Sequence, residues 1–311
     1  MAESENWERQ TLEKVALAAV AEQRRARRWG IFFKSLGFLY LFLILFIARG
    51  LMNNTDLPTA KTHTALVDME GVIAPGSQAS AERMIEGLQT AFKNKHTKGV
   101  ILRINSPGGS PVQAGQINDE IKRLRTKYPS IPLYAVVEDI CASGGYYVAV
   151  AADKIYVDKA SLVGSIGVLM DGFGFTGTMD KLGVERRLMT AGENKGFLDP
   201  FSPVDPRQKE HAQSMLSEIH DQFIQTVKKG RGARLKETEG MFSGLIWTGE
   251  RSIALGMADA IGSMDYVARE VIKAEDIVDY TPRQSLADRF AKRFGAAAAA
   301  AVLPGISTQL R

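Results

Sequence analysis

One apolar stretch near the start of the chain restricts the possible folds more than any other feature. Residues 31–51 read IFFKSLGFLYLFLILFIARGL, and Lys34 is the only charged residue before Arg49. A run of roughly 20 apolar residues is long enough to cross a bilayer as a helix. Residues 36–47 have no polar face, unlike the usual helix of a soluble protein. The sequence therefore predicts a single N-terminal transmembrane helix, which we assign to residues 30–51.

The charges around this stretch predict its orientation. Arg24, Arg25, Arg27 and Arg28 precede it, and few positive charges directly follow it. By the positive-inside rule the N-terminus is cytoplasmic and the chain after residue 52 lies on the other side. A cleaved signal peptide is the alternative, but the polar leader is about 30 residues long and no A-x-A site follows the apolar run. No aromatic-interleaved basic patch follows the arginines, so we predict no nucleic-acid partner.

The rest of the chain alternates between segments with strand and helix patterns. We divide the whole chain into a cytoplasmic leader (1–29), the anchor (30–51), a linker (52–63), one large domain (64–280) and a small-residue tail (281–311). Strands are predicted at 64–70, 99–105, 132–138 and 154–158, and helices at 79–94 and 110–127. A further long helix begins at Asp205–Pro206 and ends at Gly230 and Gly232. This alternation predicts an α/β fold with mostly parallel strands.

Two glycine pairs follow predicted strands. INSPGGSP (104–111) places Gly108 and Gly109 just before a helix, and ICASGGYYVAV (140–150) places Ser143 before Gly144. A serine at a strand-to-helix turn follows the logic of a nucleophile elbow, although the motif G-x-S-x-G is absent. The two turns could supply two N–H donors to one oxyanion. Ordinary tight turns with Ser143 as a small filler are the alternative.

A serine nucleophile requires a base. The four histidines (63, 96, 211 and 220) lie in polar segments, and we predict ordinary surface positions for them. Ser–Lys chemistry is a recognised variant, and a lysine acts as a base near neutral pH where desolvation lowers its pKa. Lys195 lies in a glycine-bounded loop beside Phe197, Leu198 and Phe201. It is the candidate base, with an ordinary solvated loop lysine as the alternative.

Several ordered motifs resemble one family. INSPGGS, ASGGYY, VGSIGV (163–168), TAGENKGFLDPF and WTGERSIALGMADAIG (247–262) together resemble the short, membrane-anchored form of the signal peptide peptidase A family, over about residues 64–275. The resemblance implies a caseinolytic protease/crotonase-like fold of repeated strand-strand-helix turns. It also implies a homo-oligomeric ring, in which a neighbouring subunit can supply the lysine.

The resemblance assigns a role to each site residue. Ser143 is the nucleophile, Lys195 the general base, Ser165 the residue that orients the lysine, and Gly109 and Gly144 the oxyanion hole. It implies no cofactor and no metal ion. The expected function is a serine endopeptidase of the bacterial inner membrane, with its catalytic domain on the extracytoplasmic side. The expected substrates are remnant signal peptides and other apolar peptides near membrane lipid.

Three alternatives stay open at this point. A catalytically silent membrane scaffold of the same fold would not need Ser143, Lys195 and both glycine turns together. An acyl-CoA hydratase-like enzyme of the crotonase fold is disfavoured by the anchor and the export topology. A Ser-His-Asp protease is disfavoured because no histidine lies in a turn that would present it to a strand end. The single Cys141 excludes an intrachain disulfide and is predicted to be a small buried filler.

Overall fold

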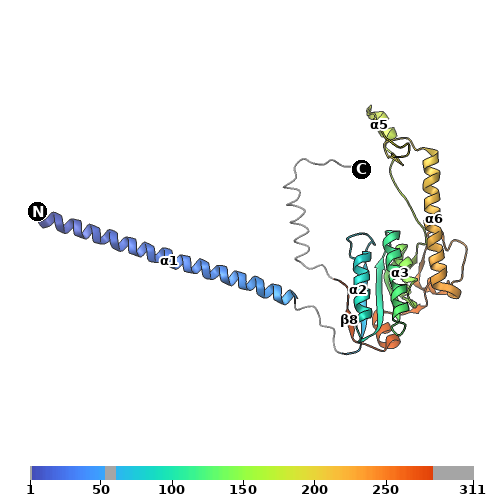
Figure 1. The fold of residues 1–311 in the computed structure, drawn as a ribbon, viewed down its shortest axis with the longest axis horizontal. Coiled ribbons are helices and arrows are strands. Elements are labelled where there is room, and N and C mark those ends of the chain that lie inside the picture. Colours follow the sequence, from blue (N-terminus) through green and yellow to red (C-terminus); the bar gives the residue numbers. More distant parts are fainter. Residues whose placement is uncertain (1, 53–60, 283–311) are drawn as a thin grey trace. The chain divides into compact units, whose positions relative to one another are not determined.

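The chain divides into two compact units, Met1–Leu57 and Pro58–Arg311. The computed structural model describes residues 2–52 and 61–282 (Figure 1). Most of the predicted linker, residues 53–60, and most of the predicted tail, residues 283–311, lie outside the described residues.

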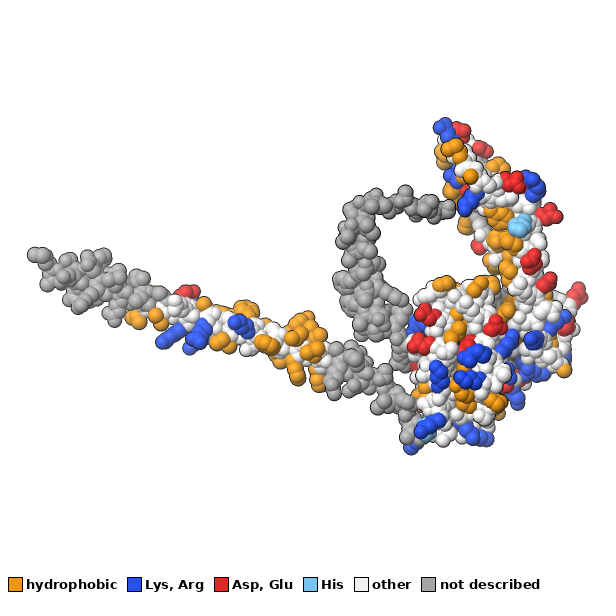
Figure 2. All heavy atoms as spheres, viewed as in Figure 1, with side chains coloured by type: hydrophobic (Ala, Val, Ile, Leu, Met, Phe, Trp, Pro, Cys, Tyr) orange, Lys and Arg blue, Asp and Glu red, His pale blue; other side chains and the backbone are white. Residues whose placement is uncertain are grey.

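The first unit is one long helix, α1 (Ala2–Met52). It runs without interruption across the predicted boundary between leader and anchor at residue 30. Its segment Val20–Phe46 is long and apolar enough to cross a membrane, with a mean hydropathy of 1.9 and none of its most apolar window buried. Length and composition thus agree with the predicted anchor. Figure 2 shows its arginine and lysine side chains followed by a band of hydrophobic ones.

The second unit is built on an eight-stranded mixed sheet in the order β6-β5-β3-β2-β1-β8, with β4 bonded to β3 and β7. The strands are β1 (His63–Glu70), β2 (Thr97–Ser106), β3 (Leu133–Ala142), β4 (Lys154–Val157), β5 (Leu162–Gly164), β6 (Ile246–Thr248), β7 (Ala260–Ile261) and β8 (Ile277–Asp279). Every pairing is parallel except β5 with β6. The predicted α/β fold with mostly parallel strands is confirmed.

Strand β3 is longer than predicted and divides its pairing between two neighbours. Tyr134–Val136 pair with β4, whereas Ile140–Ala142 pair with β5. The strand was predicted to end at Glu138. The ladder instead continues after an irregularity opposite Ile104 and Ser106. As a result β3 runs directly into Ser143.

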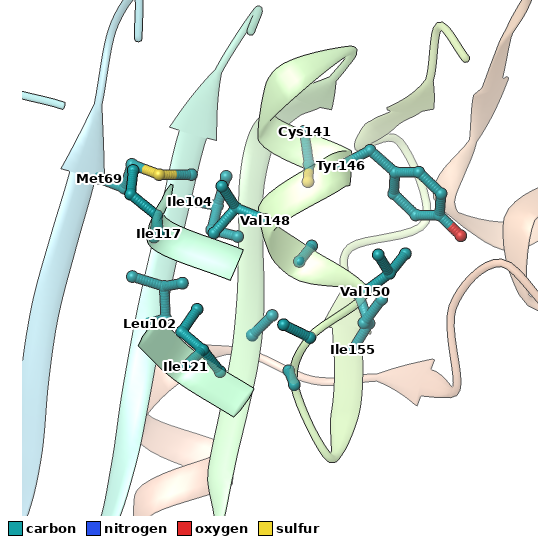
Figure 3. Close-up of a cluster of buried hydrophobic side chains, with 14 of the residues drawn as sticks. Met69, Leu102, Ile104, Ile117, Ile121, Cys141, Tyr146, Val148, Val150 and Ile155 are labelled. Carbon is teal, nitrogen blue, oxygen red and sulfur yellow. The ribbon is translucent and has the colours of Figure 1, made fainter. Parts of the chain in front are cut away.

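Helices α2 (Ala81–Lys93), α3 (Pro111–Lys127) and α4 (Gly144–Ala149) bury their apolar sides against one face of the sheet. In the close-up of Figure 3, Leu102 and Ile104 of β2 lie against Ile117 and Ile121 of α3. The predicted cap holds, since Ser110 accepts a hydrogen bond from the Gln113 N–H with Pro111 at the first turn. Short α8 (Met264–Tyr266) and η2 (Val267–Ile272) pack on part of the opposite face.

Helix α6 (Pro206–Arg231) extends from the sheet to a projecting segment, residues 168–205, which we call the arm (Figure 1). The arm contains α5 (Thr176–Leu182). Asp205 caps α6 as predicted, accepting from the Arg207 N–H. Gly230, predicted to stop α6, lies inside it. A Cβ there would meet the Val150 carbonyl oxygen at 2.3 Å, so glycine is required for close packing at this position and not as a cap. Gly232 is the actual cap. η1 (Gly232–Arg234) and α7 (Gly249–Ala254) follow.

The prediction of a surface position for His63 is wrong. His63 is the first residue of β1 and is completely buried. Its Nε2 lies 2.9 Å from the Tyr280 hydroxyl oxygen, its Nδ1 lies 3.0 Å from the Lys61 carbonyl oxygen, and its ring stacks on Tyr280. The sequence places His63 in a polar linker, but β1 begins one residue earlier than its apolar pattern indicates.

Candidate active site

Ser143 lies at the junction between β3 and α4. Its backbone has φ 51° and ψ −123°, a conformation that costs a non-glycine residue about 1–3 kcal/mol. The strand pairing holds it there, because the Ser143 N–H donates to the Gly164 carbonyl at 2.7 Å. Its hydroxyl makes no capping hydrogen bond to α4. The turn therefore presents a serine hydroxyl that is not used to stabilise the helix.

The Gly108–Gly109 turn packs directly against this junction. Gly108 has φ +99° and Gly109 has φ +146°. A Cβ on Gly108 would lie 2.6 Å from the Gly144 nitrogen and 2.7 Å from the Ser143 Cβ. A Cβ on Gly109 would lie 2.2 Å from the Ile73 carbonyl oxygen. Both positions require glycine, since backbone segments meet there without room for a side chain.

The amide groups of Gly109 and Gly144 lie side by side. The Gly109 nitrogen is 3.3 Å from the point where a Cβ of Gly144 would stand. Within residues 61–282, neither N–H donates to a backbone acceptor. Gly144 is the first residue of α4, where backbone N–H groups have no partner inside the helix. The two turns thus bring a pair of free N–H donors next to Ser143, as an oxyanion hole requires.

Ser106, at the end of β2, holds the glycine turn in place. Its side chain is completely buried. The hydroxyl donates to the Gly71 carbonyl at 2.7 Å and accepts from the Gly108 N–H at 3.1 Å. Because the Gly108 carbonyl also accepts from the Ile73 N–H at 2.8 Å, both polar groups of Gly108 are fixed. This residue was missed from the sequence, although it stands inside the quoted motif INSPGGS.

A backbone hydrogen bond links the turn of Ser165 to Ser143. Ser165 also has a positive φ, 50°, and its N–H donates to the Leu245 carbonyl at 2.8 Å. The preceding residue, Gly164, accepts the Ser143 N–H. Four of the five predicted site residues, Ser143, Gly109, Gly144 and Ser165, are therefore carried by adjoining turns of one sheet.

The comparisons with known proteins can be set beside this geometry. The sequence profile of Peptidase family S49 matches residues 125–278. A relative from Methanocaldococcus jannaschii, the putative protease MJ0651, is 32% identical over 213 residues, which cover 67% of this chain and 68% of that protein. The chain belongs to peptidase family S49.

Other similarities are partial or remote. A Brucella abortus protein named Na(+)/H(+) antiporter NhaA is 40% identical over 210 residues, 68% of this chain. The match spans 28% of that relative's length. A solved structure described as a 1510-N membrane-bound stomatin-specific protease in complex with a substrate peptide aligns with a TM-score of 0.45 and 14% identity. That alignment covers 76% of this chain and 99% of the solved one.

Lys195 lies apart from the other predicted site residues, on the arm. Its side chain is exposed. Its loop rests on the beginning of α6, where the Leu198 N–H donates to Gln208 Oε1 at 3.1 Å and Phe197 contacts the His211 ring edge-on at 5.9 Å. Twelve residues further along α6, His220 Nε2 donates to the Ile166 carbonyl at 3.1 Å. At 1.5 Å per residue, the two contact points Gln208 and His220, twelve residues apart, are separated by about 18 Å along the axis of α6.

The histidine predictions have different outcomes. His220 was predicted to be an ordinary surface residue, which is wrong, since it joins α6 to the residue after Ser165. The periodicity of α6 gave no signal for this contact because the partner is a backbone carbonyl 54 residues away. His211 stays on the arm side of α6 against Phe197.

Two buried ionisable side chains, those of Cys141 and Tyr146, lie close to Ser143 in the sequence. Burial raises the pKa of the Cys141 thiol well above its usual range, so this cysteine is the inert filler that was predicted. Burial likewise raises the pKa of the Tyr146 hydroxyl, which donates to the Met257 carbonyl at 2.9 Å. Among the described residues, no group of three His, Cys, Asp or Glu side chains could hold a metal ion. The groups that the two turns bring together are the Ser143 hydroxyl and the N–H groups of Gly109 and Gly144.

Proposed function

We propose that this S49 protein is a membrane-anchored serine endopeptidase that works through an acyl-enzyme on Ser143. One observation carries the proposal. A strained serine at a strand-to-helix turn lies beside two free N–H groups, those of Gly109 and Gly144. A silent scaffold would have no need for the strain at Ser143 or for unpaired donors next to it.

The proposed reaction has two halves. The neutral amine of Lys195 takes the proton from Ser143 Oγ as the oxygen attacks the peptide carbonyl carbon. The N–H groups of Gly109 and Gly144 stabilise the resulting oxyanion, and the amine of the leaving peptide receives the proton as the C–N bond breaks. Water then attacks the ester in the same manner, releasing the acid and restoring the Ser143 hydroxyl.

We propose that the lysine in each site comes from a neighbouring subunit of a homo-oligomeric ring. Within one chain the Lys195 loop contacts α6 at Gln208 and the Ser165 turn contacts it at His220, and these points lie about 18 Å apart along the helix axis. The arm also exposes hydrophobic side chains (Figure 2). Among them are Leu169 (80% exposed), Phe173 (79%) and Met189 (95%). Such a surface is typical of a protein–protein interface. Contact with a second subunit would remove water from Lys195, as its role as a base requires.

The proposed substrates are remnant signal peptides and other apolar, extended peptides near the membrane. Val72 and Val112 are exposed at 55% and 68%. Val72 precedes Ile73, which bridges to Gly109, and Val112 follows Pro111 at the start of α3. Apolar substrate side chains could pack on them. With α1 as the anchor and its arginines on the cytoplasmic side, the catalytic unit would face the extracytoplasmic side of a bacterial inner membrane.

The test uses the full-length protein in detergent, with a fluorophosphonate label and an apolar reporter peptide. We expect wild type to be labelled once per active site and Ser143→Ala to lose both labelling and cleavage. Ser217→Ala is the matched control, because this exposed serine on α6 bonds only within its own helix. Labelling that persists in Ser143→Ala, or a wild type that neither labels nor cleaves, would overturn the proposal in favour of the scaffold.

A further inference from the structure

A hydrogen bond closes the base of the arm. The chain leaves the sheet for the arm just after Ile166 and returns along α6 (Figure 1). His220 of α6 donates from Nε2 to the Ile166 carbonyl at 3.1 Å. Ile166 is completely buried, and a buried carbonyl requires a donor. Within residues 61–282 no other group donates to this carbonyl, so His220 alone satisfies it.

This bond also restrains the stretch of chain that follows Ser165. As far as the structure describes the chain, the backbone N–H groups of residues 166–174 donate no hydrogen bond, and the Ile166 carbonyl is the one carbonyl of the stretch that accepts one. The Ser165 N–H is bonded on its other side, to the Leu245 carbonyl at 2.8 Å. The position of the chain after Ser165 therefore depends on His220.

Helix α6 is itself fixed to the helix that follows Ser143. The rings of Phe223 and Tyr147 lie 5.1 Å apart, and the hydroxyl oxygens of Thr226 and Tyr147 lie 3.0 Å apart. The Tyr147 N–H in turn donates to the Ser143 carbonyl at 2.9 Å. His220 stands three positions before Phe223, so the two side chains share one face of α6. This face thus reaches both the Ser143 turn and the Ser165 turn.

These contacts form a closed circuit around Ser143. Its N–H is bonded to Gly164, and its carbonyl is bonded to Tyr147. The first branch continues from Gly164 through Ser165 to the carbonyl that His220 holds, and the second continues through Tyr147 to α6. Opening the circuit at His220 would leave Ser143 bonded but would let Ser165 move relative to it. A shift of about 1 Å in a group that positions the reaction can lower the rate by about 10²-fold.

We propose that His220 is a positioning residue for the reaction on Ser143. It holds the turn of Ser165, the residue proposed to orient Lys195, in a fixed place beside the nucleophile. Because a carbonyl oxygen only accepts hydrogen bonds, Nε2 carries the hydrogen, and the ring acts as a donor and not as a base. The inference rests on the proposed peptidase function.

The experiment compares two amides that differ by one methylene. Glutamine can place its side-chain nitrogen where Nε2 of His220 stands, whereas asparagine ends one bond short of that point. We expect His220→Gln to cleave the apolar reporter peptide with a kcat within about twofold of wild type, and His220→Asn with a kcat lowered by about tenfold or more at an unchanged KM. Rates are measured on full-length protein in detergent and expressed per folded molecule. Equal kcat values for the two variants would overturn the proposal, because loss of the ring alone affects both.

A second measurement does not depend on peptide cleavage. Hydrogen exchange followed by mass spectrometry reports local opening of a turn. Fragments that contain Ser165 should exchange faster in His220→Asn than in wild type or His220→Gln, while fragments from β1 should exchange alike in all three proteins. Equal exchange at Ser165 in the three would overturn the proposal. A wild type that neither labels with fluorophosphonate nor cleaves would overturn the peptidase, and the exchange data would still decide whether His220 holds the turn.

Wild type itself supplies a test if His220→Asn folds poorly. In full-length protein with ¹⁵N-labelled histidine, the ring signal that His220→Gln lacks belongs to His220. We expect this ring to carry a hydrogen on Nε2, since the Ile166 carbonyl can only accept. A neutral ring with its hydrogen on Nδ1 would overturn the proposal.

Discussion

The turns around Ser143 and the arm differ in how their residues are held. Ser143, Gly108 and Ser165 each have backbone hydrogen bonds to a neighbouring strand or turn. The arm has no such support, and none of the residues of α5, all of them described, is buried. In the proposed mechanism, the groups that need precise placement thus lie on the sheet. The proposed base, Lys195, lies on an exposed segment that a second subunit could cover.

The arm is nevertheless ordered within itself. The Phe175 N–H donates to the Pro200 carbonyl at 2.7 Å, and the rings of Phe175 and Phe201 stack at 5.4 Å. These contacts close the arm into a loop on the end of α6. The arm can therefore carry Lys195 as one folded segment. Substitutions in the arm and in the sheet should test their separate roles.

The largest effect on peptide cleavage in this set is expected from Lys195→Ala. Loss of a general base lowers the rate by about 10²–10⁴-fold. Lys181→Ala, which changes a lysine at the end of α5, should leave cleavage unchanged. The decisive measurement mixes Lys195→Ala with Ser143→Ala protein before assembly. If the lysine comes from a neighbour, roughly a quarter of the sites in a random equal mixture regain both groups. A mixture as inactive as its components would place the base in the same chain.

The next effect is expected from a charge placed on the apolar surface of the arm. Leu169→Asp should weaken assembly and reduce cleavage in proportion to the oligomer lost, because a carboxylate in an apolar interface is left without a partner. Ile261→Asp, at an exposed position on β7, is the matched control. Mass photometry in detergent reports the assembly. Full assembly of Leu169→Asp would show that this surface is not the interface.

A smaller effect is expected from Ser106→Ala, which frees the Gly108 N–H and loosens the turn that carries Gly109. We expect fluorophosphonate acylation to slow by about tenfold, less than loss of an oxyanion donor itself, while KM for the peptide stays the same. Ser252→Ala is a matched control, since its hydroxyl is also completely buried and donates to the Gly249 carbonyl at 2.7 Å. Equal unfolding temperatures with equal acylation rates in the two variants would remove the positioning role of Ser106.

The smallest effect on cleavage concerns the root of α6. The Asp259 carboxylate accepts two hydrogen bonds from Arg231, at 2.8 and 2.9 Å. Desolvation opposes ionisation of Asp259, but the hydrogen bonds from Arg231 and from the Ile155 N–H, together with the positive charges of Arg231 and Arg234, outweigh it, and the pKa of Asp259 is lowered. A lowered folded-state pKa stabilises the fold above the unfolded pKa, about 3.9, and this stabilisation is lost as pH falls through the folded value.

Asp259→Asn should therefore lower the free energy of unfolding by about 3 kcal/mol near pH 7, with a smaller difference from wild type below pH 4. Urea unfolding of the two proteins across this range measures it. Cleavage per folded molecule should not change. A difference that stays constant with pH would show that the ion pair is not its source.

The sequence predicted β1 to β4 and two helix caps, because these depend on local patterns. It did not predict β5 to β8, which have only two or three residues each and so carry no readable alternation. Ser110–Pro111 and Asp205–Pro206 begin helices as predicted, and Ser143 follows a strand at a turn. The extension of β3 beyond Glu138 and the burial of His63 were missed, since both depend on partners far along the chain. The separation of Lys195 from Ser143 follows from the path of the arm and α6. No local spacing encodes that path.

The positive φ of Ser143 has a thermodynamic consequence for the whole fold. Glycine adopts this conformation without the strain that any side chain adds. Ser143→Gly should therefore unfold at a higher temperature than Ser143→Ala, with a difference in unfolding free energy of about 1–2 kcal/mol, as thermal denaturation of the two inactive proteins would show. A lower or equal melting temperature for the glycine variant would mean the turn is unstrained. If the strain is real, selection for stability alone would favour glycine at this position, so a serine there is maintained against the stability of its own fold.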